Sequence, residues 1–344
     1  DKNVKGGAVN KQHAAKICKV YDLASRNGVP VVGIFDSNGA FVDDGAEALA
    51  AYSEMLMWAN NLSGVVPQIS VVAGTCVGSA ALIACSADFV VATEDAELYL
   101  APNAGKNGAA AAELGTVSVL AKNDNEAVES ARKLISMLPA NNLSTAPEFE
   151  YGVSSKLAEG KAADIAEAIA DAESIVEVSE KFGTAAYTAI ATIGGSAVGI
   201  AATNKTDAKL TSDDSAKLAR FVRTCDAFSI PVVTIIDTEG FESNDNIRDL
   251  AKLANAYAEA TTVKVSVVTG KAYGSAMVAL GTANADMTFA YADAVISPLA
   301  PVTAVEFLWH DKLKGAADVA AERTKLAAEY AENRTSDRYT VKYV

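Results

Sequence analysis

Histidine is nearly absent from this chain, since only His13 and His310 occur among its 344 residues. Histidine is the side chain whose ordinary pKa suits proton transfer near neutral pH. Neither residue lies in a motif with a partner acid, so each is better explained as a surface or hydrogen-bonded histidine. We therefore expect chemistry that needs little help from acidic or basic side chains.

Cysteine is also scarce, and its four occurrences, Cys18, Cys76, Cys85 and Cys225, follow no paired spacing. The cysteine pairs of a zinc site are missing, as is the cysteine density of a disulfide-stabilised secreted domain. The sequence also shows no signal peptide. Together these features predict a cytoplasmic protein that holds no metal.

Basic residues are in deficit, because 29 Lys and Arg face 43 Asp and Glu, a formal net charge of −14. Such a chain is a poor partner for nucleic acid or for an anionic membrane surface. One uncharged run, residues 69–87, is long enough to cross a bilayer. It contains several Ser, Thr and Gly residues, and its later counterpart contains Lys271, so a strand followed by a buried helix is the better interpretation.

What the chain does have is an internal repeat. Residues 29–40 resemble 230–241 at an offset of 201, and residues 71–80 resemble 267–276 at an offset of 196. Each half reads as helix, strand, helix, strand, small-residue helix and strand. The expected ranges are 10–27, 29–35, 47–61, 68–73, 79–87 and 89–92 in the first half, and 213–228, 230–236, 246–260, 263–268, 275–285 and 287–290 in the second.

The repeat predicts an α/β protein of two tandem domains related by duplication, because a period near 200 is domain-sized and strands alternate with helices. Residues 138–151 are turn-rich and polar, which is typical of a linker. We expect a first domain at 1–140, a linker and connecting helix at 141–180, and a second domain at 181–344. Asp36 and Asp237 are expected to form turns at the ends of their strands.

Both halves contain the string Gly-x-x-x-Gly-Ser-Ala after an apolar strand, at 74–80 and 270–276. A glycine turn that leads into a helix leaves first-turn N–H groups without intrahelical partners, and such donors suit an oxyanion or a phosphate. The glycines could instead serve only to permit a tight turn. Repetition of the whole string favours a functional role. Neither copy matches the Gly-x-Gly-x-x-Gly dinucleotide fingerprint.

The first copy also has the form of a nucleophile elbow with Cys76 in the reactive position, which would imply an α/β-hydrolase with His310 as base. The second copy has Ala272 at that position, and alanine cannot act as a nucleophile. The two copies preserve backbone geometry rather than a side chain. Stabilisation of negative charge by N–H groups is therefore the favoured chemistry, and the hydrolase is the alternative.

Five strings, at residues 36–40, 63–70, 74–80, 221–231 and 271–276, resemble a known family. They look like the carboxyltransferase subunits of biotin-dependent acyl-CoA carboxylases and decarboxylases (propionyl-CoA carboxylase beta, methylmalonyl- and glutaconyl-CoA decarboxylase alpha). The resemblance covers nearly the whole chain. It implies two crotonase-like domains (ββα superhelices) and an active site between the N-terminal domain of one subunit and the C-terminal domain of another. A homo-oligomer follows, either a dimer or a trimer of dimers.

By this resemblance, N–H groups of the first half hold the thioester oxygen of acyl-CoA, and those of the second half hold carboxybiotin. The biotin nitrogen can take the α-proton of the acyl-CoA, so no protein base is required. The implied partners are a biotin carboxyl carrier protein and either a biotin carboxylase or a membrane decarboxylase subunit. The residues implied as catalytic are Gly39, Ala40, Gly78 and Ser79 in the first half, and Gly240, Phe241, Gly274, Ser275 and Ala276 in the second.

The chain departs from the family pattern in several places. Asn38 and Phe41 stand where many members have glycine and arginine, and Ser79 and Ser275 stand where they have a second glycine. The chain is shorter than is usual in the family, and it contains neither a Cys-rich zinc ribbon nor an Ala-Met-Lys-Met biotin attachment string. We expect neither zinc nor biotin attached to this chain. A non-catalytic assembly subunit of the same fold is a further alternative.

Four residues are candidate substrate contacts. Lys5 and Lys11 belong to a basic N-terminal cluster that could hold the CoA phosphates, although a solvated helix face is the simpler explanation of the cluster. By the resemblance, Met277 and Val278 line the acyl pocket, and an apolar pair there favours propionyl or larger groups over acetyl. Burial in the core is the alternative role for both.

Overall fold

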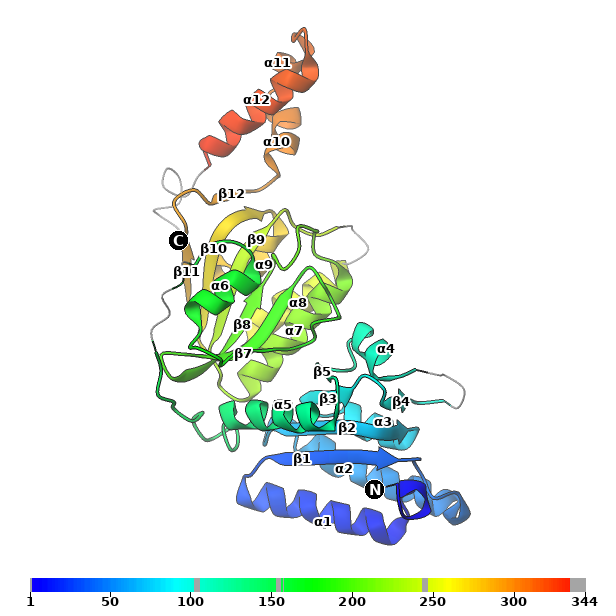
Figure 1. The fold of residues 1–344 in the computed structure, drawn as a ribbon. Coiled ribbons are helices and arrows are strands. Elements are labelled where there is room, and N and C mark those ends of the chain that lie inside the picture. Colours follow the sequence, from blue (N-terminus) through cyan, green and yellow to red (C-terminus); the bar gives the residue numbers. More distant parts are fainter. Residues whose placement is uncertain (1, 102–105, 153–155, 157, 243–246, 335–344) are drawn as a thin grey trace.

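The computed structural model describes residues 2–101, 106–152, 156, 158–242 and 247–334, which form two sheets with their helices and a helical extension (Figure 1). The first sheet has the order β1-β2-β3-β5, with β4 beside β2, and all its pairings are parallel. Its strands are β1 (Val31–Ser37), β2 (Gln68–Val77), β3 (Phe89–Thr93), β4 (Glu97–Tyr99) and β5 (Val119–Ala121).

The second sheet has the order β11-β10-β9-β8-β7-β6, with β12 beside β10. The pairings from β8 to β11 are parallel, whereas β6, β7 and β8 pair antiparallel. Its strands are β6 (Val176–Glu177), β7 (Tyr187–Ile193), β8 (Ser196–Ala202), β9 (Val232–Thr238), β10 (Lys264–Tyr273), β11 (Met287–Ala290) and β12 (Val295–Ser297).

The helices follow the repeat as well. In the first half they are α1 (Lys11–Asn27), α2 (Ala46–Asn61) and α3 (Ser79–Cys85), and in the second α7 (Ser212–Ala227), α8 (Ile247–Glu259) and α9 (Ser275–Leu280). The helices outside the repeat are α4 (Gly108–Glu113), α5 (Asp124–Met137), α6 (Ala162–Ile169), α10 (Pro301–Leu308), α11 (His310–Lys314) and α12 (Val319–Glu332), and short 3₁₀ turns occur at Lys5–Gly7, Val42–Asp44 and Thr282–Asn284.

The predicted order of elements is confirmed in both halves. The N-caps show why the paired helices begin where they do: Asn10 accepts from the backbone N–H of His13, and Thr211, 201 positions later, accepts from that of Asp214. One difference concerns the second strand of each half, which was expected to end at residues 73 and 268. Both β2 and β10 continue through the first glycine of the repeated string to Val77 and Tyr273. Residue 246, the expected start of the helix now seen as α8, lies outside the described residues.

Helix α5 joins the two halves through the core. Figure 1 shows it between the sheets, and one apolar cluster runs from Ile69 and Val91 of the first sheet through Leu134 of α5 to Ile190 and Ile236 of the second. All five side chains are almost fully buried. The two repeats are therefore held against each other by continuous apolar packing.

The helical extension, α10 to α12, has a small apolar cluster of its own that includes Leu313, Leu326 and Tyr330. It projects from the second sheet in Figure 1. No helix in the described part of the chain has the length and apolarity that a membrane span needs. The described residues also bring together no group of three His, Cys, Asp or Glu side chains that could hold a metal ion.

Candidate active site

Each half contains a bulge in its central strand pair, and an aspartate closes it. In the first half Phe35 pairs with Val72 and Ser37 with Cys76, so three residues of β2 lie opposite the single residue Asp36. The Asp36 carboxylate accepts the backbone N–H of Thr75 at 3.1 Å. Beyond the bulge, β2 continues to Val77, and α3 begins at Ser79.

The second half repeats this arrangement around Asp237. Its carboxylate accepts the backbone N–H of Lys271 at 2.8 Å, and the register of β9 and β10 shifts at the same place. A Cβ at Gly74 would lie 2.5 Å from the Asp36 carboxylate, and one at Gly270 would lie 2.4 Å from that of Asp237. In each half, the aspartate carboxylate therefore occupies the space that a side chain at the paired glycine would need. The expected turn role of Asp36 and Asp237 is wrong, because both brace a bulge.

Four glycines that were expected to take part in catalysis shape the backbone. Gly78 (φ 61°, ψ −131°) and Gly274 (φ 57°, ψ −129°) adopt nearly the same conformation, which side chains disfavour. Their N–H groups already donate to the carbonyls of Tyr99 and Ser297, at 2.9 Å in both cases. The N–H of Gly39 likewise donates to the hydroxyl of Ser37, and that of Gly240 donates to the hydroxyl of Thr238, at 3.1 Å in both cases.

The backbone N–H groups available to a ligand belong to the residues that follow these glycines. Ser79 and Ser275 are the first residues of α3 and α9, where a backbone N–H has no intrahelical acceptor. Ala276 is the next residue of α9 and shares this position in the first turn. Among the described residues, no hydrogen-bond acceptor faces the N–H of Ser79, Ser275 or Ala276.

Ala40 supplies a second donor to the first half. The N–H of Val9 donates to Gly39 (2.9 Å) and the N–H of Phe41 donates to Val9 (3.0 Å), so the N–H of Ala40 between them points away from that bridge. The loop also presses on the end of β2, since a Cβ at Gly39 would lie 2.9 Å from the carbonyl oxygen of Val77. The segment that contains Ala40 therefore runs beside the end of β2, from which the chain passes to α3.

Phe241 supplies the second backbone N–H donor in the second half. The N–H of Leu210 donates to Gly240 (3.0 Å) and that of Glu242 donates to Leu210 (2.9 Å), which leaves the N–H of Phe241 directed to the other side. Each half thus offers two backbone donors from neighbouring segments, the composition of an oxyanion hole. We call these pairs the first centre (Ala40 and Ser79) and the second centre (Phe241 and Ser275).

The charged side chains beside the first centre have different partners from those beside the second. The ammonium of Lys5 lies 4.4 Å from the ring centroid of Phe41, which places an exposed cation next to the first centre. Lys11 pairs with Glu47 at 3.7 Å on the surface, a contact of little energetic weight. Near the second centre, Lys271 pairs with Glu239 at 2.8 Å, and this carboxylate raises the pKa of Lys271 above its usual range.

The two expected pocket residues on α9 occupy different environments. Met277 is buried in the main core cluster, whereas Val278, the next residue along the helix, is 69% exposed. Only Val278 can touch a ligand directly in this arrangement. Met277 lies beneath it and supports the helix from the core side.

The structure does not support a Cys76 nucleophile. Cys76 is fully buried, and burial raises the pKa of its thiol to about 12, so the reactive thiolate is suppressed near neutral pH. The exposed His310 lies on α11, which Figure 1 shows at the opposite end of the molecule from β2. The base that a hydrolase needs is therefore far from this cysteine.

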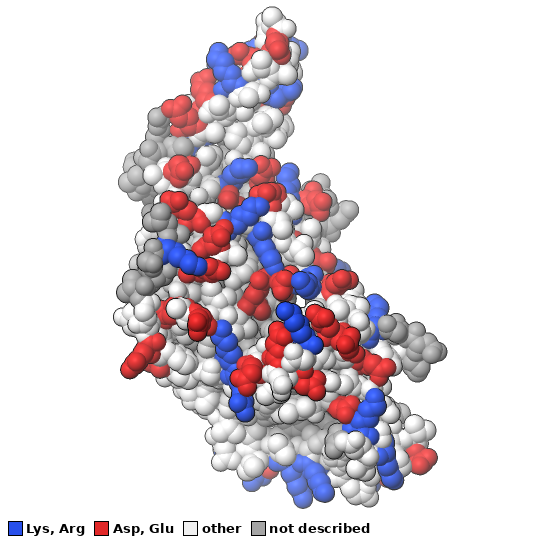
Figure 2. Space-filling view, in the orientation of Figure 1, with Lys and Arg blue, Asp and Glu red and all other residues white. Residues whose placement is uncertain are grey.

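Acidic and basic side chains are intermixed over the face shown in Figure 2, which has no broad surface of one sign.

The sequence analysis predicted only some of the residues that build the two centres. Asp36, Asp237, Ser37 and Thr238 were missed as supports, although the recurrence of an Asp and a hydroxyl residue at one offset was a visible signal.

The sequence of the chain is similar to those of several known proteins. The family described as carboxyl transferase domain matches residues 1–341. The chain is 34% identical over 370 residues to methylmalonyl-CoA decarboxylase subunit alpha of Propionigenium modestum, an alignment that covers 96% of this chain and 72% of that protein. It is also 34% identical over 366 residues to the putative propionyl-CoA carboxylase beta chain of Bacillus subtilis (strain 168), with 96% and 72% covered.

Among solved structures, the chain matches transcarboxylase 12S, described as a hexamer assembly with methylmalonyl-coenzyme A and methylmalonic acid bound. The TM-score is 0.89 at 30% sequence identity, and the match covers 97% of this chain and 72% of that one. The expected fold, two tandem crotonase-like domains of α/β type, is confirmed by this similarity together with the two sheets described above.

Proposed function

This chain belongs to the carboxyl transferase domain family, and from that premise we propose that it moves a carboxyl group between biotin on a carrier protein and a short-chain acyl-CoA. The names of its relatives, a methylmalonyl-CoA decarboxylase subunit and a putative propionyl-CoA carboxylase chain, support acyl-CoA carboxyl transfer as the activity. The observation that carries the proposed mechanism is a duplicated pair of backbone N–H groups, Ala40 with Ser79 and Phe241 with Ser275, for which the described residues provide no acceptor.

The first centre is assigned to the acyl-CoA, within residues 1–140, and the second to carboxybiotin, within residues 181–344. We assign two backbone N–H groups of the first centre to the thioester oxygen as it gains enolate charge, and two of the second centre to the ureido oxygen of biotin. When bound, carboxybiotin supplies the carboxyl group, and its ring nitrogen takes the α-proton in exchange. The residues of this chain bind, orient and stabilise charge, in keeping with the scarcity of histidine. Lys5, beside the first centre, is positioned to attract the CoA phosphates.

The two centres of one chain are well separated, since α3 and α9 lie in different halves of the molecule in Figure 1. We therefore propose that a second copy completes the site and that the active species is a dimer or a trimer of dimers. The partners proposed for it are a biotin carboxyl carrier protein and either a biotin carboxylase or a membrane decarboxylase subunit. We place this assembly in the cytoplasm, with any membrane attachment made through a partner.

The direct test is carboxyl transfer by the purified protein from radiolabelled methylmalonyl-CoA to a biotinylated carrier domain. We expect label on the carrier only when enzyme and both substrates are present, and only in fractions that light scattering shows to be oligomeric. A folded oligomer without transfer in either direction would favour the non-catalytic assembly role. A fully active monomer would contradict the shared site.

Substrate size provides a second prediction. An exposed apolar side chain at Val278 lowers the cost of seating an alkyl group, and one methylene in such a pocket changes transition-state binding by roughly 1–3 kcal/mol. Val278→Asp is therefore expected to reduce the preference for propionyl-CoA over acetyl-CoA by about tenfold or more. Turnover on acetyl-, propionyl- and butyryl-CoA, or their carboxylated forms, measures this ratio. Met277→Leu, a conservative change in the core, serves as the control and should leave the ratio unchanged.

A further inference from the structure

The 3₁₀ turn Lys5–Gly7 is bound to the loop that follows β1. The carbonyl of Gly6 accepts the backbone N–H of Asn38 at 2.9 Å, and the carbonyl of Gly7 accepts the hydroxyl of Ser37 at 2.7 Å. The same loop carries one of the two backbone donors of the first centre. The turn therefore has a defined position beside that centre.

The backbone of this turn has a conformation that lysine seldom adopts. Lys5, Gly6 and Gly7 all have positive φ angles, of 50°, 63° and 69°. Glycine takes up such angles freely, whereas a side chain makes them costly. Residues held in this region are frequent at ligand-binding sites, where the surrounding contacts maintain the strain. The conformation of Lys5 therefore favours a specific role for its side chain.

The two residues of the loop that depart from the family pattern, Asn38 and Phe41, both lie against this turn. The amide of Asn38 lies over Gly6, since a Cβ at Gly6 would be 2.4 Å from the Asn38 Nδ2. The ammonium of Lys5 lies 4.4 Å from the centroid of the Phe41 ring. An arginine at position 41, as many family members have, would place its guanidinium in about the space of that ring. The Lys5 ammonium therefore returns a positive charge to nearly the same place.

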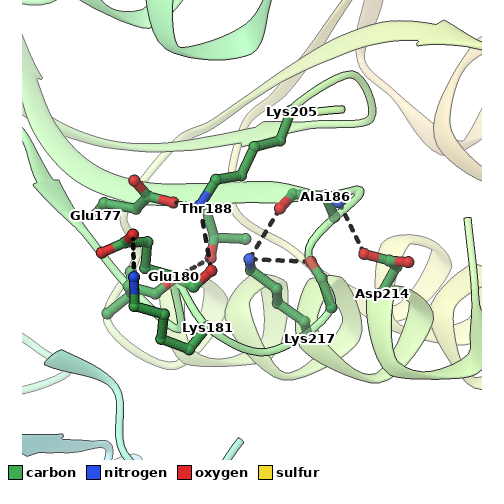
Figure 3. Close-up of polar contacts among 10 residues, drawn as sticks. Glu177, Glu180, Lys181, Ala186, Thr188, Lys205, Asp214 and Lys217 are labelled. Atoms are coloured by element: carbon green, nitrogen blue, oxygen red, sulfur yellow. Dashed lines mark hydrogen bonds and ion pairs between the residues drawn. The ribbon is translucent and has the colours of Figure 1, made fainter. Parts of the chain in front are cut away.

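The positive charge of Lys5 is available to a ligand. Figure 3 shows the contrast with lysines of the second half, where Lys181 pairs with Glu180 at 2.8 Å and Lys205 pairs with Glu177. In the part of the chain that the structure describes, the Lys5 ammonium has neither a hydrogen-bond acceptor nor a carboxylate partner. An aromatic ring attracts an ammonium through its π-electrons and leaves the N–H donors free. These donors can therefore bind an anion.

This arrangement of cation and ring is specific to the first half. At the offset of 201, Lys5 corresponds to Thr206, and Phe41 corresponds to Glu242. Neither counterpart is basic or aromatic, so the second half does not repeat the contact. The exposed ammonium thus lies beside the centre that is assigned above to acyl-CoA.

We propose that Lys5 binds an anionic group of the acyl-CoA and takes the place of an arginine at position 41, with Asn38 and Phe41 holding its turn. The proposal rests on acyl-CoA as the ligand of the first centre, as proposed above. The anionic group is either a phosphate of CoA or the carboxylate of a carboxylated acyl group, because both offer oxygen atoms to an ammonium. Phe41 acts through Lys5 and is a positioning residue.

The test is the dissociation constant of methylmalonyl-CoA, measured by calorimetry, which does not require carboxyl transfer. Lys5→Met removes the ammonium from an exposed side chain and should raise the Kd about tenfold or more, the loss that follows removal of a hydrogen bond to a charged group. Lys19→Met, a change at another exposed lysine, on α1, is the control and should leave the Kd unchanged. Circular dichroism checks the fold of each variant.

Restoration of the cation from position 41 separates a binding role of Lys5 from a structural one. Phe41→Arg in the Lys5→Met background places a guanidinium beside the first centre and should return the Kd to within about threefold of the starting value. Phe41→Leu in the same background is the matched control. It supplies no charge, so the Kd should remain raised.

Substrates that lack one of the two anionic groups identify which group Lys5 binds. Thioesters of pantetheine have no CoA phosphates, and propionyl-CoA has no free carboxylate. If Lys5 binds a phosphate, the effect of Lys5→Met should be present with propionyl-CoA and absent with methylmalonyl-pantetheine. If Lys5 binds the acyl carboxylate, the reverse is expected. Either pattern supports the proposal and assigns the group.

Equal dissociation constants for the starting protein and Lys5→Met would overturn the proposal. A raised Kd that Phe41→Arg does not lower, or that Phe41→Leu lowers equally, would overturn it as well. A starting protein that binds no acyl-CoA would remove this assignment together with the proposed function. Binding with the expected effects but without carboxyl transfer would support the role of Lys5 and contradict the proposed reaction alone.

Discussion

Replacing Ser79 or Ser275 with proline is expected to lower turnover by about 10²- to 10³-fold, the loss that follows removal of one oxyanion donor. Each serine is the first residue of its helix, where the backbone N–H has no intrahelical acceptor. Proline fits this position because its fixed φ suits the first turn, and the chain itself has Pro301 at the start of α10. The substitution thus deletes the donor and leaves the helix in place.

The controls separate the lost donor from other effects of proline. Ser79→Ala and Ser275→Ala keep the N–H and should retain turnover within a few-fold of the starting protein, since the hydroxyl has no assigned role. Ser79→Val and Ser275→Val add bulk comparable to the proline ring and also keep the N–H. Transfer rates are measured alongside circular dichroism. Proline variants that fold and turn over like their valine controls would show that these N–H groups do not carry catalysis.

The order of elements could be predicted because apolar periodicity is local and was present in two copies. Helices α1 and α7 begin within one residue of the predicted positions. Their N-caps, Asn10 and Thr211, fix where they start. The ends of β2 and β10 were misjudged because glycine was taken as the end of a strand. Here Gly74 stays in the strand, since the carboxylate of Asp36 occupies the space that its side chain would need.

The chemical roles within the candidate site were harder to predict. A sequence string does not show which N–H groups already have partners, so Gly78 was grouped with Ser79 although it donates to Tyr99. The burial of neighbouring residues was also hidden, because Met277 and Val278 are both apolar, yet Met277 lies in the core and Val278 is exposed. These assignments depend on hydrogen bonds and packing between segments that are distant in sequence.

Removing the aspartate that stabilises the bulge beside a centre should reduce activity nearly as much as removing a backbone donor. Asp36→Ala is expected to lower kcat by about 10²-fold, because losing the acceptor for the Thr75 N–H lets the bulge relax, and a displacement of about 1 Å at reacting groups can cost that much. The same loss is expected for Asp237→Ala, which frees the N–H of Lys271. Both aspartates are positioning residues, so kcat should fall more than substrate affinity.

Asp36→Asn distinguishes this positioning role from a role of the charge. The amide oxygen of asparagine can still accept the Thr75 N–H, so the bulge should hold and kcat should recover to within about tenfold of the starting protein. Hydrogen exchange at the Thr75 amide gives a readout separate from activity: it should be fast in Asp36→Ala and slow in Asp36→Asn. If both variants lost the same activity while this amide stayed protected, the carboxylate charge would be acting on the reaction itself. In that event the duplicated aspartates would belong to the chemistry of the two centres, and the account of catalysis by backbone donors alone would have to be abandoned.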